Sequence, residues 1–554
     1  MSGLGVDESS GVLMFRSVPW AGFRRYQDAV SAIFPGKAIT VFAREPFEEK
    51  PPSSNIKYAG YSSSIVKLSS DDMRDIGISS NAFEWAVIPC HKKAAAPYRN
   101  LAEIALRAVT KGIIFLFDDL SMETVALDDG ETTCPRDSLA FRKKLYGLVH
   151  KNDPFFWPER QLNYAHKVYG DELPENLPGN GEAGGVLLVY THLLEANAAT
   201  VDESIRSFYK YSTFHVLGLN AEMGIPPFVR KMRFAAIVLH YSAFYPLHFL
   251  DERYPEFRSF LNGLNGSVKV AFFQDEHFGC AKRFKFINEY GIDLIYSCFA
   301  PSAFKDYYFK FTGPRDVRSC IPSYVDGALP AIAARFSLPR DQRPVDIGYR
   351  GRPVPCYMGK GTYEKYEIGD VFAQKCAQKG LKLKLDIGLT SKGRLYGDDW
   401  NRFLGSCRGM LGVESGSDLV DIGGKAFDAC AKLYEENPEM PFGEMYQRAG
   451  LARLDNNMSY RTISARHFEA AAFMCVQILF EGEYSGMMKP MVHYIPLKKD
   501  FSNFDEVIMM FNDGELCGRL VENAYNDLIA SGRYTYESFI SEFDKALAGH
   551  IEGK

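Results

Sequence analysis

Short apolar runs separated by helical stretches recur along this chain. In its first third, the runs typical of buried strands are VLMF (12–15), AITVFA (38–43), WAVIP (85–89) and GIIFLF (112–117), and NLAEIALRAV (100–109) has helical spacing. This alternation predicts an α/β domain, because a series of buried strands needs helices to cover the faces of its sheet.

Two more strand series follow the first. The second consists of VLLVY (186–190), TFHVLG (213–218), FAAIVLH (234–240), VKVAFF (268–273) and DLIYS (293–297). The third consists of VDIGY (345–349), LKLKLDIGL (381–389) and GMLGV (409–413). We therefore expect an α/β protein with three domains, at residues 1–180, 181–340 and 341–554, of which the last two are Rossmann-like and face each other across a cleft.

Helical spacing dominates the C-terminal part of the chain. It predicts helices over 399–406, within an insertion at 424–450, and along 503–549. The run RHFEAAAFMCVQILF (466–480) is predicted to form one helix that is buried beyond its first turns. We expect the terminal helices to cross back onto the middle domain.

The composition is that of an ordinary globular protein, since 46% of the 554 residues are hydrophobic and 24% are charged. A net charge of −5 argues against general nucleic-acid binding, so we expect no nucleic-acid partner. The eleven cysteines occur singly, which excludes zinc-ribbon and disulfide-scaffold patterns and favours the cytoplasm. No apolar run approaches the roughly 18 residues of a membrane span, although peripheral membrane association stays open.

The densest polar cluster follows a strand of the second series. FFQDEHFG (272–279) contains Asp275, Glu276 and His277. Carboxylate and imidazole groups in this place can serve as a general base or accept a hydrogen bond from a sugar hydroxyl, so we take these three as candidate catalytic residues. The alternative is a polar loop whose side chains make only turn hydrogen bonds.

The third series carries cations and small residues near its strand ends. The candidates for a site that binds an anionic ligand are Arg350, Arg352, Lys365, Arg394, Glu414, Ser415 and Gly416. The segment 414–416 is prone to turn and can point backbone N–H groups at a phosphate. At the start of the helix predicted over 466–480, Arg466 suits a phosphate and Glu469 suits a diol. The alternative for this pair is a surface ion pair at i,i+3 spacing.

Two other motifs do not predict a site. Gly179, Gly181 and Gly184 form a G-x-G-x-x-G that precedes a strand, so a bound phosphate would meet no helix N-terminus. Asp118 and Asp119 end a strand, but no D-x-D follows them, and we interpret them as helix caps.

The last two series resemble the group 1 glycosyltransferases of the GT-B fold, and most closely the branch related to spore-maturation glycosyltransferases. The likeness is carried by FFQDEHFG (272–279), DLIYSCFAPSAF (293–304), VDIGYRGRPVPCYMG (345–359) and RHFEAAAFMCVQILFEGEYSGMMKPMVHYIPLKKD (466–500). It covers roughly residues 186–550 and leaves the first domain unassigned.

This resemblance implies transfer of a sugar from a nucleotide-sugar donor to a glycan or another hydroxyl acceptor, in glycan biosynthesis, with no essential metal or cofactor. It implies that a carboxylate at the position of Glu469 grips the donor ribose. It also implies that basic side chains neutralise the diphosphate, here Arg466, Arg350, Arg352 and Lys365. Many relatives carry a second glutamate where this chain has Thr462, and Glu414, or the N–H groups of Ser415 and Gly416, can substitute for it.

Other functions stay open on the same fold, because fold does not fix function. A nucleotide-sugar epimerase or hydrolase would release a free sugar instead of a glycoside. A catalytically inactive carbohydrate-binding or assembly subunit would release no nucleotide. The sequence specifies neither the donor base and sugar, nor the acceptor, nor the stereochemical outcome.

Overall fold

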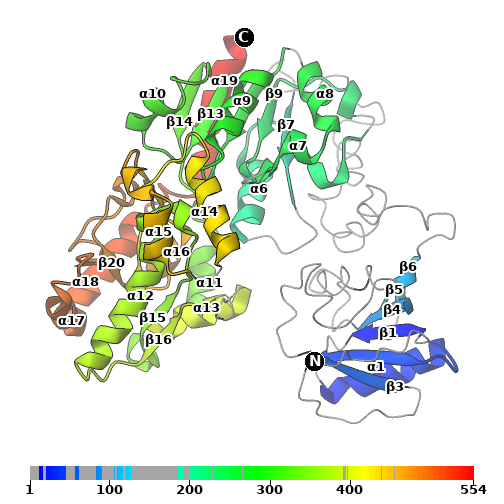
Figure 1. Cartoon of the computed structure of the whole chain (residues 1–554), viewed down its shortest axis with the longest axis horizontal. Helices are drawn as coiled ribbons and strands as arrows, with labels where there is room; N and C mark the ends of the chain where they lie inside the picture. Colours follow the sequence, from blue (N-terminus) through cyan, green and yellow to red (C-terminus); the bar gives the residue numbers. More distant parts are fainter. Residues whose placement is uncertain are drawn as a thin grey trace. The chain divides into compact units, whose positions relative to one another are not determined.

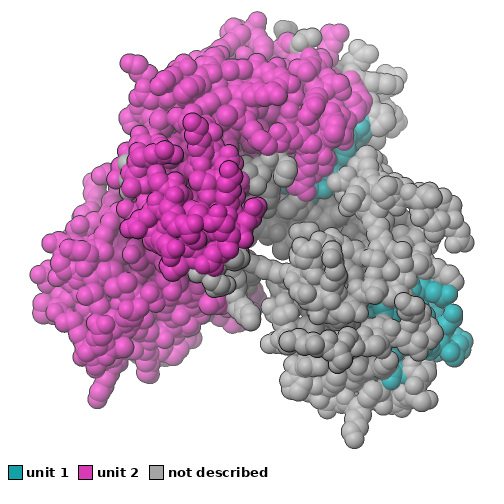
Figure 2. Space-filling view, viewed as in Figure 1, with its two compact units in different colours: residues 1–172, 191–197, 218–226 teal, residues 173–190, 198–217, 227–554 magenta. Residues whose placement is uncertain are grey.

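The structure is a computed structural model in two compact units (Figure 2), formed by residues 1–172, 191–197 and 218–226 and by residues 173–190, 198–217 and 227–554. The residues that it describes are 11–15, 20–44, 56–61, 83–89, 105, 109–116, 120, 122–126, 185–192, 199–226, 229–245, 248–264, 266–390, 393, 395, 397–437, 440–454 and 456–554. The N-terminal domain and the two motifs rejected above, at 118–119 and 179–184, are therefore described only in part or not at all.

The first sheet has six strands in the order β3-β2-β1-β4-β5-β6. The strands are β1 (Val12–Phe15), β2 (Ile39–Arg44), β3 (Ile56–Tyr61), β4 (Phe83–Pro89), β5 (Val109–Leu116) and β6 (Met122–Ala126), and helix α1 spans Trp20–Ile33. All pairs are parallel except the last, β5 with β6. Val12, Met14, Phe23 and Val30 share one core cluster, which ties α1 to the sheet.

The second sheet has the order β14-β13-β12-β9-β7-β8. Its strands are β7 (Val186–Tyr190), β8 (Val216–Asn220), β9 (Ala236–Leu239), β12 (Val268–Phe272), β13 (Leu294–Ser297) and β14 (Asp316–Ser319). The other elements here are α6 (Ala199–Tyr211), the hairpin β10 (Phe244–Tyr245) and β11 (His248–Phe249), α7 (Leu250–Arg253), α8 (Glu256–Gly263), α9 (Cys280–Tyr290), α10 (Phe304–Tyr307) and α11 (Leu329–Phe336). Every residue of β7 is buried, as expected for a parallel strand covered on both faces.

The third sheet is parallel throughout, in the order β16-β15-β17-β20-β21. Its strands are β15 (Val345–Arg350), β16 (Leu385–Gly388), β17 (Cys407–Gly412), β20 (Val476–Phe480) and β21 (Ile495–Leu497), and β18 (Ser415–Ser417) pairs with β19 (Tyr460–Thr462) outside it. The helices are α12 (Lys360–Gln378), α13 (Gly397–Ser406), α14 (Lys425–Glu436), α15 (Phe442–Arg448), α16 (Ala465–Ala472), α17 (Phe504–Asn512), α18 (Gly514–Tyr525) and α19 (Tyr536–Glu552).

The prediction of one long helix over 466–480 is wrong in its second half. Helix α16 ends at Ala472, Met474 takes a φ of 55°, and the chain then enters β20, between β17 and β21. All five residues of β20 are buried. An apolar run in a central parallel strand has the same lack of polar positions as a buried helix, and only the β-branched Val476 and Ile478 favoured the strand.

The last helix returns to the second sheet, and Figure 1 shows α19 (red) beside β13 and β14. Asp544 on α19 accepts a hydrogen bond of 2.9 Å from the hydroxyl of Ser212. The ring of Phe543 lies 5.3 Å from that of Phe208 on α6, edge to face.

The α/β fold built on parallel sheets is thus confirmed. Among the described residues, no helix is long and apolar enough to cross a membrane.

Candidate functional site

A cavity of about 450 Å³ lies at the carboxyl ends of the parallel strands β15 and β17. We call it the central cavity. Of the predicted site residues that the structure describes, six line it: Asp275, Arg350, Arg352, Lys365, Ser415 and Arg466. Asp275 comes from the loop after β12 of the second sheet, whereas the other five lie on β15, the segment after β15, α12, β18 and α16. Strand ends and helix starts from different elements therefore bring one acid and several cations to the same space.

The N-terminus of α16 opens onto the central cavity through Ser464, Ala465, Arg466 and His467. Because the first N–H groups of a helix lack partners within it, this end carries partial positive charge. The Arg466 guanidinium donates to the backbone carbonyl of Arg350 and lies 5.6 Å from the ring centre of Trp400. The helix start and the arginine together favour an anion here.

Arg350 lines the cavity, but its guanidinium is already engaged. It forms an ion pair of 2.9 Å with Asp386 and lies 3.9 Å from the ring centre of Phe403. Its side chain is only 13% exposed. The charge predicted to meet a phosphate is therefore largely neutralised within the protein, and Arg350 contributes mainly the carbonyl that holds Arg466.

Lys365 on α12 projects toward the strand ends, where its ammonium donates to the hydroxyl of Ser415 over 3.3 Å. Burial lowers the pKa of Lys365 to about 8; Asp275 opposes this shift, while Arg466, Arg461 and Arg352 reinforce it. The lysine is therefore a cation at neutral pH that loses its proton more readily than an exposed one. A bound phosphate would raise its pKa again.

The three predicted catalytic residues have different surroundings. Asp275 has a φ of 51° and lines the cavity, where solvent reaches it. Loss of water around its carboxyl group raises the pKa of Asp275, whereas the positive charges of Lys365 and Arg283 lower it. Asp275 is thus the member of the trio that a ligand in the central cavity can touch.

Glu276 is fully buried, and its carboxylate accepts from the Ser297 hydroxyl over 2.7 Å, from the Cys298 N–H over 2.8 Å, and from the Tyr308 hydroxyl. It holds the loop after β12 against the second sheet and does not reach the cavity. His277 is also buried, and burial lowers its pKa to about 3, so its ring is neutral.

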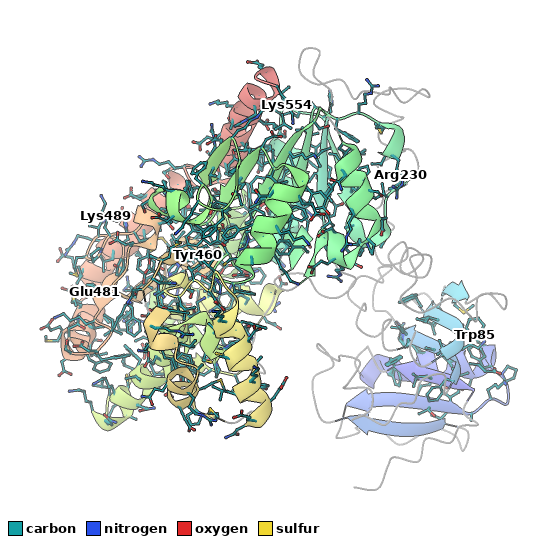
Figure 3. The ribbon with its side chains drawn as sticks, turned by 45° about the horizontal axis from the view of Figure 1, so that its top comes forward. Trp85, Arg230, Tyr460, Glu481, Lys489 and Lys554 are labelled. Atoms are coloured by element: carbon teal, nitrogen blue, oxygen red, sulfur yellow. The ribbon has the colours of Figure 1, made fainter. Side chains whose placement is uncertain are left out.

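The ring of His277 lies 5.6 Å from that of Tyr460. Tyr460, labelled in Figure 3, stands on β19 and also packs at 4.6 Å against Phe299. Both histidine ring nitrogens are buried without a hydrogen-bond partner among the described residues. His277 therefore packs between aromatic rings and reaches the cavity only through its neighbours.

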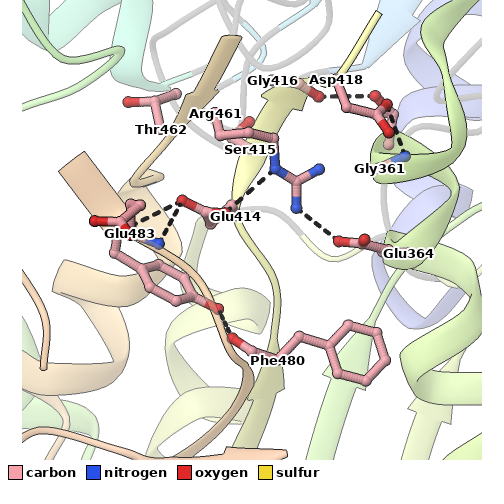
Figure 4. Close-up of polar contacts among 12 residues, drawn as sticks. Gly361, Glu364, Glu414, Ser415, Gly416, Asp418, Arg461, Thr462, Phe480 and Glu483 are labelled. Carbon is pink, nitrogen blue, oxygen red and sulfur yellow. Dashed lines mark hydrogen bonds and ion pairs between the residues drawn. The ribbon is translucent and has the colours of Figure 1, made fainter. Parts of the chain in front are cut away.

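Glu414, predicted as part of a phosphate-binding turn at 414–416, is engaged by other groups of the protein. Figure 4 shows its carboxylate joined to Arg461 by an ion pair of 3.3 Å. The same carboxylate accepts from the N–H groups of Glu483 and Tyr484 over 3.1 and 2.8 Å. These three donors direct Glu414 away from the central cavity.

Gly416 belongs to β18, which pairs with β19. It has a φ of 85°, and a Cβ atom there would lie 1.8 Å from the carbonyl oxygen of Tyr460. The glycine is required by this close pairing of two strands, so the segment forms a ladder instead of a phosphate-binding turn.

Glu469, on the second turn of α16, accepts a hydrogen bond of 3.0 Å from the indole N–H of Trp400. Burial raises the pKa of Glu469, while the bond from Trp400 and the charge of Arg466 lower it. Trp400 lines the central cavity, and Glu469 adjoins the cavity through this hydrogen bond. Arg394, the remaining candidate, lies outside the described residues.

Two residues that line the central cavity, His467 and Gln477, were not predicted from the sequence. The backbone N–H of Ser464 donates to Nδ1 of His467 over 3.1 Å, so the neutral ring carries its proton on Nε2. Burial lowers the pKa of His467 to about 4, which keeps it neutral. Gln477 of β20 donates to the carbonyl of His467 over 3.1 Å. The sequence indicated His467 as a site residue only through its position next to Arg466. Gln477 was not expected at a cavity because it lies in the stretch predicted as helix.

Among the residues that the structure describes, no His, Cys, Asp and Glu side chains gather in the groups of three or more that a metal ion needs. The expectation of a metal-independent reaction remains a prediction.

No family model and no curated protein matches this chain. Among solved structures, TarM shows 12% identity and a TM-score of 0.34 over 57% of this chain and 55% of its own. An alpha-glucosyltransferase in complex with UDP-glucose and DNA containing an abasic site shows 11% identity and a TM-score of 0.39, over 65% of this chain and 98% of its own. HepE of Anabaena, in complex with UDP-glucose, shows 9% identity and a TM-score of 0.36, over 67% of this chain and 100% of its own.

The chain thus spans about 55% of the length of TarM. Similarity at this level does not define a family, and the function has to be inferred from the chain's own residues.

Proposed function

We propose that this protein transfers a sugar from a nucleotide-sugar donor, held in the central cavity, to a hydroxyl group of an acceptor. The observation that carries the proposal is the meeting, in one cavity, of Arg466, Lys365 and the start of α16 with the acid Asp275 from the opposite sheet. A diphosphate fits the cations, and a reacting hydroxyl fits the acid. The branch related to spore maturation and a role in glycan biosynthesis are part of this proposal.

The cations match the charge that develops during such a reaction. When a nucleoside diphosphate leaves, negative charge grows on its phosphate oxygens while the sugar acquires oxocarbenium character. Arg466 is fixed by the carbonyl of Arg350, and Lys365 by the hydroxyl of Ser415, before any ligand arrives. Preorganised donors of this kind stabilise a developing anion without reorganisation, and on this ground we propose that the reaction needs no metal ion.

The donor ribose is assigned to Glu469. One of its carboxylate oxygens accepts from Trp400 over 3.0 Å. A carboxylate has lone pairs for further donors, so the other oxygen can accept from a ribose hydroxyl placed beside the indole. His467, with its proton on Nε2, is a neutral donor for a phosphate or sugar oxygen in the same cavity.

Asp275 is assigned to the acceptor hydroxyl. Its raised pKa improves its ability to take a proton, and a general base must lie within hydrogen-bond reach of the hydroxyl that attacks. Glu276 has no part in this step because its oxygens are occupied by three internal donors. His277 supports the loop on which Asp275 stands.

A two-stage experiment tests the proposal. Calorimetric titration of UDP, GDP and ADP should give binding of one nucleoside diphosphate, and chelation of metals should not abolish it. Release of that nucleotide from its sugar donor should then depend on an added acceptor, and the product should be a glycoside. Binding of none of these nucleotides would overturn the donor site; a free altered sugar would establish an epimerase or hydrolase, and binding without release an inactive subunit.

A further inference from the structure

A second cavity, of about 560 Å³, lies in the helical insertion after the third sheet's strand β17. We call it the aromatic cavity. Its walls come from α14, α15, the first turns of α12 and the segment 352–357, and Figure 1 shows α14 and α15 side by side. Within the described part of the chain, five aromatic rings line it, from Tyr357, Tyr363, Phe427, Tyr434 and Phe442.

The aromatic cavity adjoins the central cavity. Arg352 and Val354 line both of them. Tyr357 stands close to the same junction, because its ring packs edge to face at 5.9 Å against Phe278, on the loop that carries Asp275. The charges of Arg352 and Asp275 both act on the phenol of Tyr357. A molecule in the aromatic cavity can therefore extend past Tyr357 toward Asp275.

The lining of the aromatic cavity selects for an apolar ligand. Among the residues that the structure describes, Arg352, at the junction, is the only charged residue of the lining, and no amide or carboxylate side chain belongs to it. Besides Arg352, the described lining offers a saccharide three tyrosine hydroxyls, on Tyr357, Tyr363 and Tyr434. A saccharide has more hydroxyl groups than these partners can pair, and each one left unpaired costs free energy. The aromatic rings instead offer apolar area, and Met440 and Met445 are flexible side chains that adapt to a chain of varying shape.

The rings are also held in place. Tyr363 and Phe442 stack at 4.0 Å with an angle of 16° between their planes. Phe427 packs at 4.8 Å against Tyr357. By contrast, Tyr434 is 59% exposed, so one large aromatic side chain at the rim faces solvent. The pocket stands on a buried apolar cluster that includes Met440 and Met445. A preformed apolar pocket with an exposed aromatic rim is typical of a ligand site.

We propose that the aromatic cavity binds the apolar tail of an amphiphilic acceptor, whose hydroxyl head reaches Asp275 in the central cavity. This inference rests on the proposed transferase function for the identity of the ligand as acceptor. The cavity volume lies in the range that holds a ligand of small-molecule size. The helical insertion α14–α15 then serves substrate selection: it admits acceptors with a hydrophobic tail and gives a free sugar no comparable contact.

The test uses monomeric n-alkyl β-glucosides, from hexyl to decyl, titrated below the concentrations at which they form micelles. Each methylene that enters the cavity should tighten binding about fourfold. Ala431→Trp places an indole in the cavity from α14 and should abolish this dependence on chain length. Lys432→Trp, on the same helix but not in the lining, is the matched control and should retain the dependence. Affinity independent of chain length in the natural protein overturns the inference.

Titration of the nucleoside diphosphate into the same variants separates the two proposals. Intact nucleotide binding in Ala431→Trp, together with lost tail binding, supports a tail site. Tail binding in a protein that binds no nucleotide supports the cavity but overturns the transferase. If Ala431→Trp does not fold, Tyr434→Ser replaces it, since this exposed side chain supports no core; it should weaken binding of the decyl glucoside at least threefold, and an unchanged affinity overturns the inference.

Discussion

The indole N–H of Trp400 donates a hydrogen bond of 3.0 Å to the carboxylate of Glu469. Arg466, three positions earlier on α16, lies over the same indole with its guanidinium 5.6 Å from the ring centre. In the part of the chain that the structure describes, Arg466 and Glu469 thus meet at Trp400 and do not form the surface ion pair that their spacing allows. Two charged groups are fixed beside one cavity wall before a ligand binds.

Replacement of Glu469 by Gln tests the ribose contact. The amide oxygen can still accept from Trp400, but no charged oxygen is then left for a ribose hydroxyl. We expect binding of the nucleoside diphosphate to weaken by about 1.5–3 kcal/mol, the contribution of hydrogen bonds to a charged group. Calorimetric titration of the folded variant measures this loss.

Glu506→Gln is the control, because Glu506 is an exposed glutamate on α17, away from the cavity. It should bind the nucleotide as the natural protein does. Equal affinity of Glu469→Gln and the control would mean that Glu469 only positions Trp400.

The pKa of Lys365 predicts a pH dependence of donor binding. Because burial lowers this pKa to about 8, the ammonium is largely charged at pH 7 and largely neutral at pH 9. If the diphosphate binds the charged form, its dissociation constant should rise about tenfold between these two pH values. Lys365→Arg, which stays charged, should bind equally well at both. A natural protein with no pH dependence in this range would exclude Lys365 from the diphosphate contact.

The same shift has an opposite consequence for stability. An unfolded lysine keeps its proton up to about pH 10.5, whereas the folded one loses it near 8, so between these values the unfolded state binds more protons. The free energy of unfolding therefore gains a favourable contribution as the pH rises from 8 to 10.5. Lys365→Met should remove this gain, as urea unfolding at several pH values will measure.

Much of the fold could be predicted from the sequence because parallel strands are continuous apolar runs. The runs predicted at 186–190 and 345–349 became β7 and all but the last residue of β15. The strand 476–480 was missed because its apolar run continues directly from α16, and only the tertiary setting separates the two. In such a run, the types of the residues alone hardly distinguish a helix from a strand.

The cavity was harder to predict than the fold. Lys365 and Arg466 were found because cations near strand ends and helix starts have few purely local roles. Glu414 and Arg350 are also charged residues near strand ends, but each is paired with a residue far away in the sequence. Arg461 lies 47 positions from Glu414, and Asp386 lies 36 positions from Arg350. A sequence shows which residues carry charge, and only the fold shows which charges are already paired.

Asp275 and Glu276 are neighbours in sequence, and we predict opposite effects of replacing them. Asp275→Asn removes a carboxylate from the cavity wall, so turnover should fall by about 10²–10⁴-fold, the usual contribution of a general base. The melting temperature should hardly change, since solvent reaches this side chain. Steady-state assays at saturating donor, with thermal melting of the same samples, measure both effects.

Glu276→Ala should instead unfold at a lower temperature, because it leaves the Ser297 hydroxyl and the Cys298 N–H without an acceptor in a buried place. Activity per folded molecule should be largely kept at temperatures below the transition. If Asp275→Asn kept full turnover and Glu276→Ala folded stably without activity, the assignment of the two residues would have to be exchanged.

The last prediction concerns the buried charges around Arg461. Its guanidinium lies between Glu364, at 2.6 Å, and Glu414, at 3.3 Å, and its side chain is 10% exposed. Glu414→Ala removes one of the two carboxylates and also the acceptor of the Glu483 and Tyr484 N–H groups. Because the remaining charge is buried and poorly compensated, the loss should be about 3–5 kcal/mol of stability, measured as a lower urea midpoint.

The matched control is Glu436→Ala, which breaks an ion pair of 2.9 Å with Arg448 whose partners are 58% and 47% exposed. Surface pairs of this kind contribute about 0–1 kcal/mol, so its midpoint should stay near that of the natural protein. Combining Glu414→Ala with Arg461→Met should recover part of the loss, since the buried cation that has lost one of its two carboxylates is then gone. If Glu414→Ala instead left the midpoint unchanged and abolished nucleotide binding, Glu414 would belong to the donor site and not to the framework behind it.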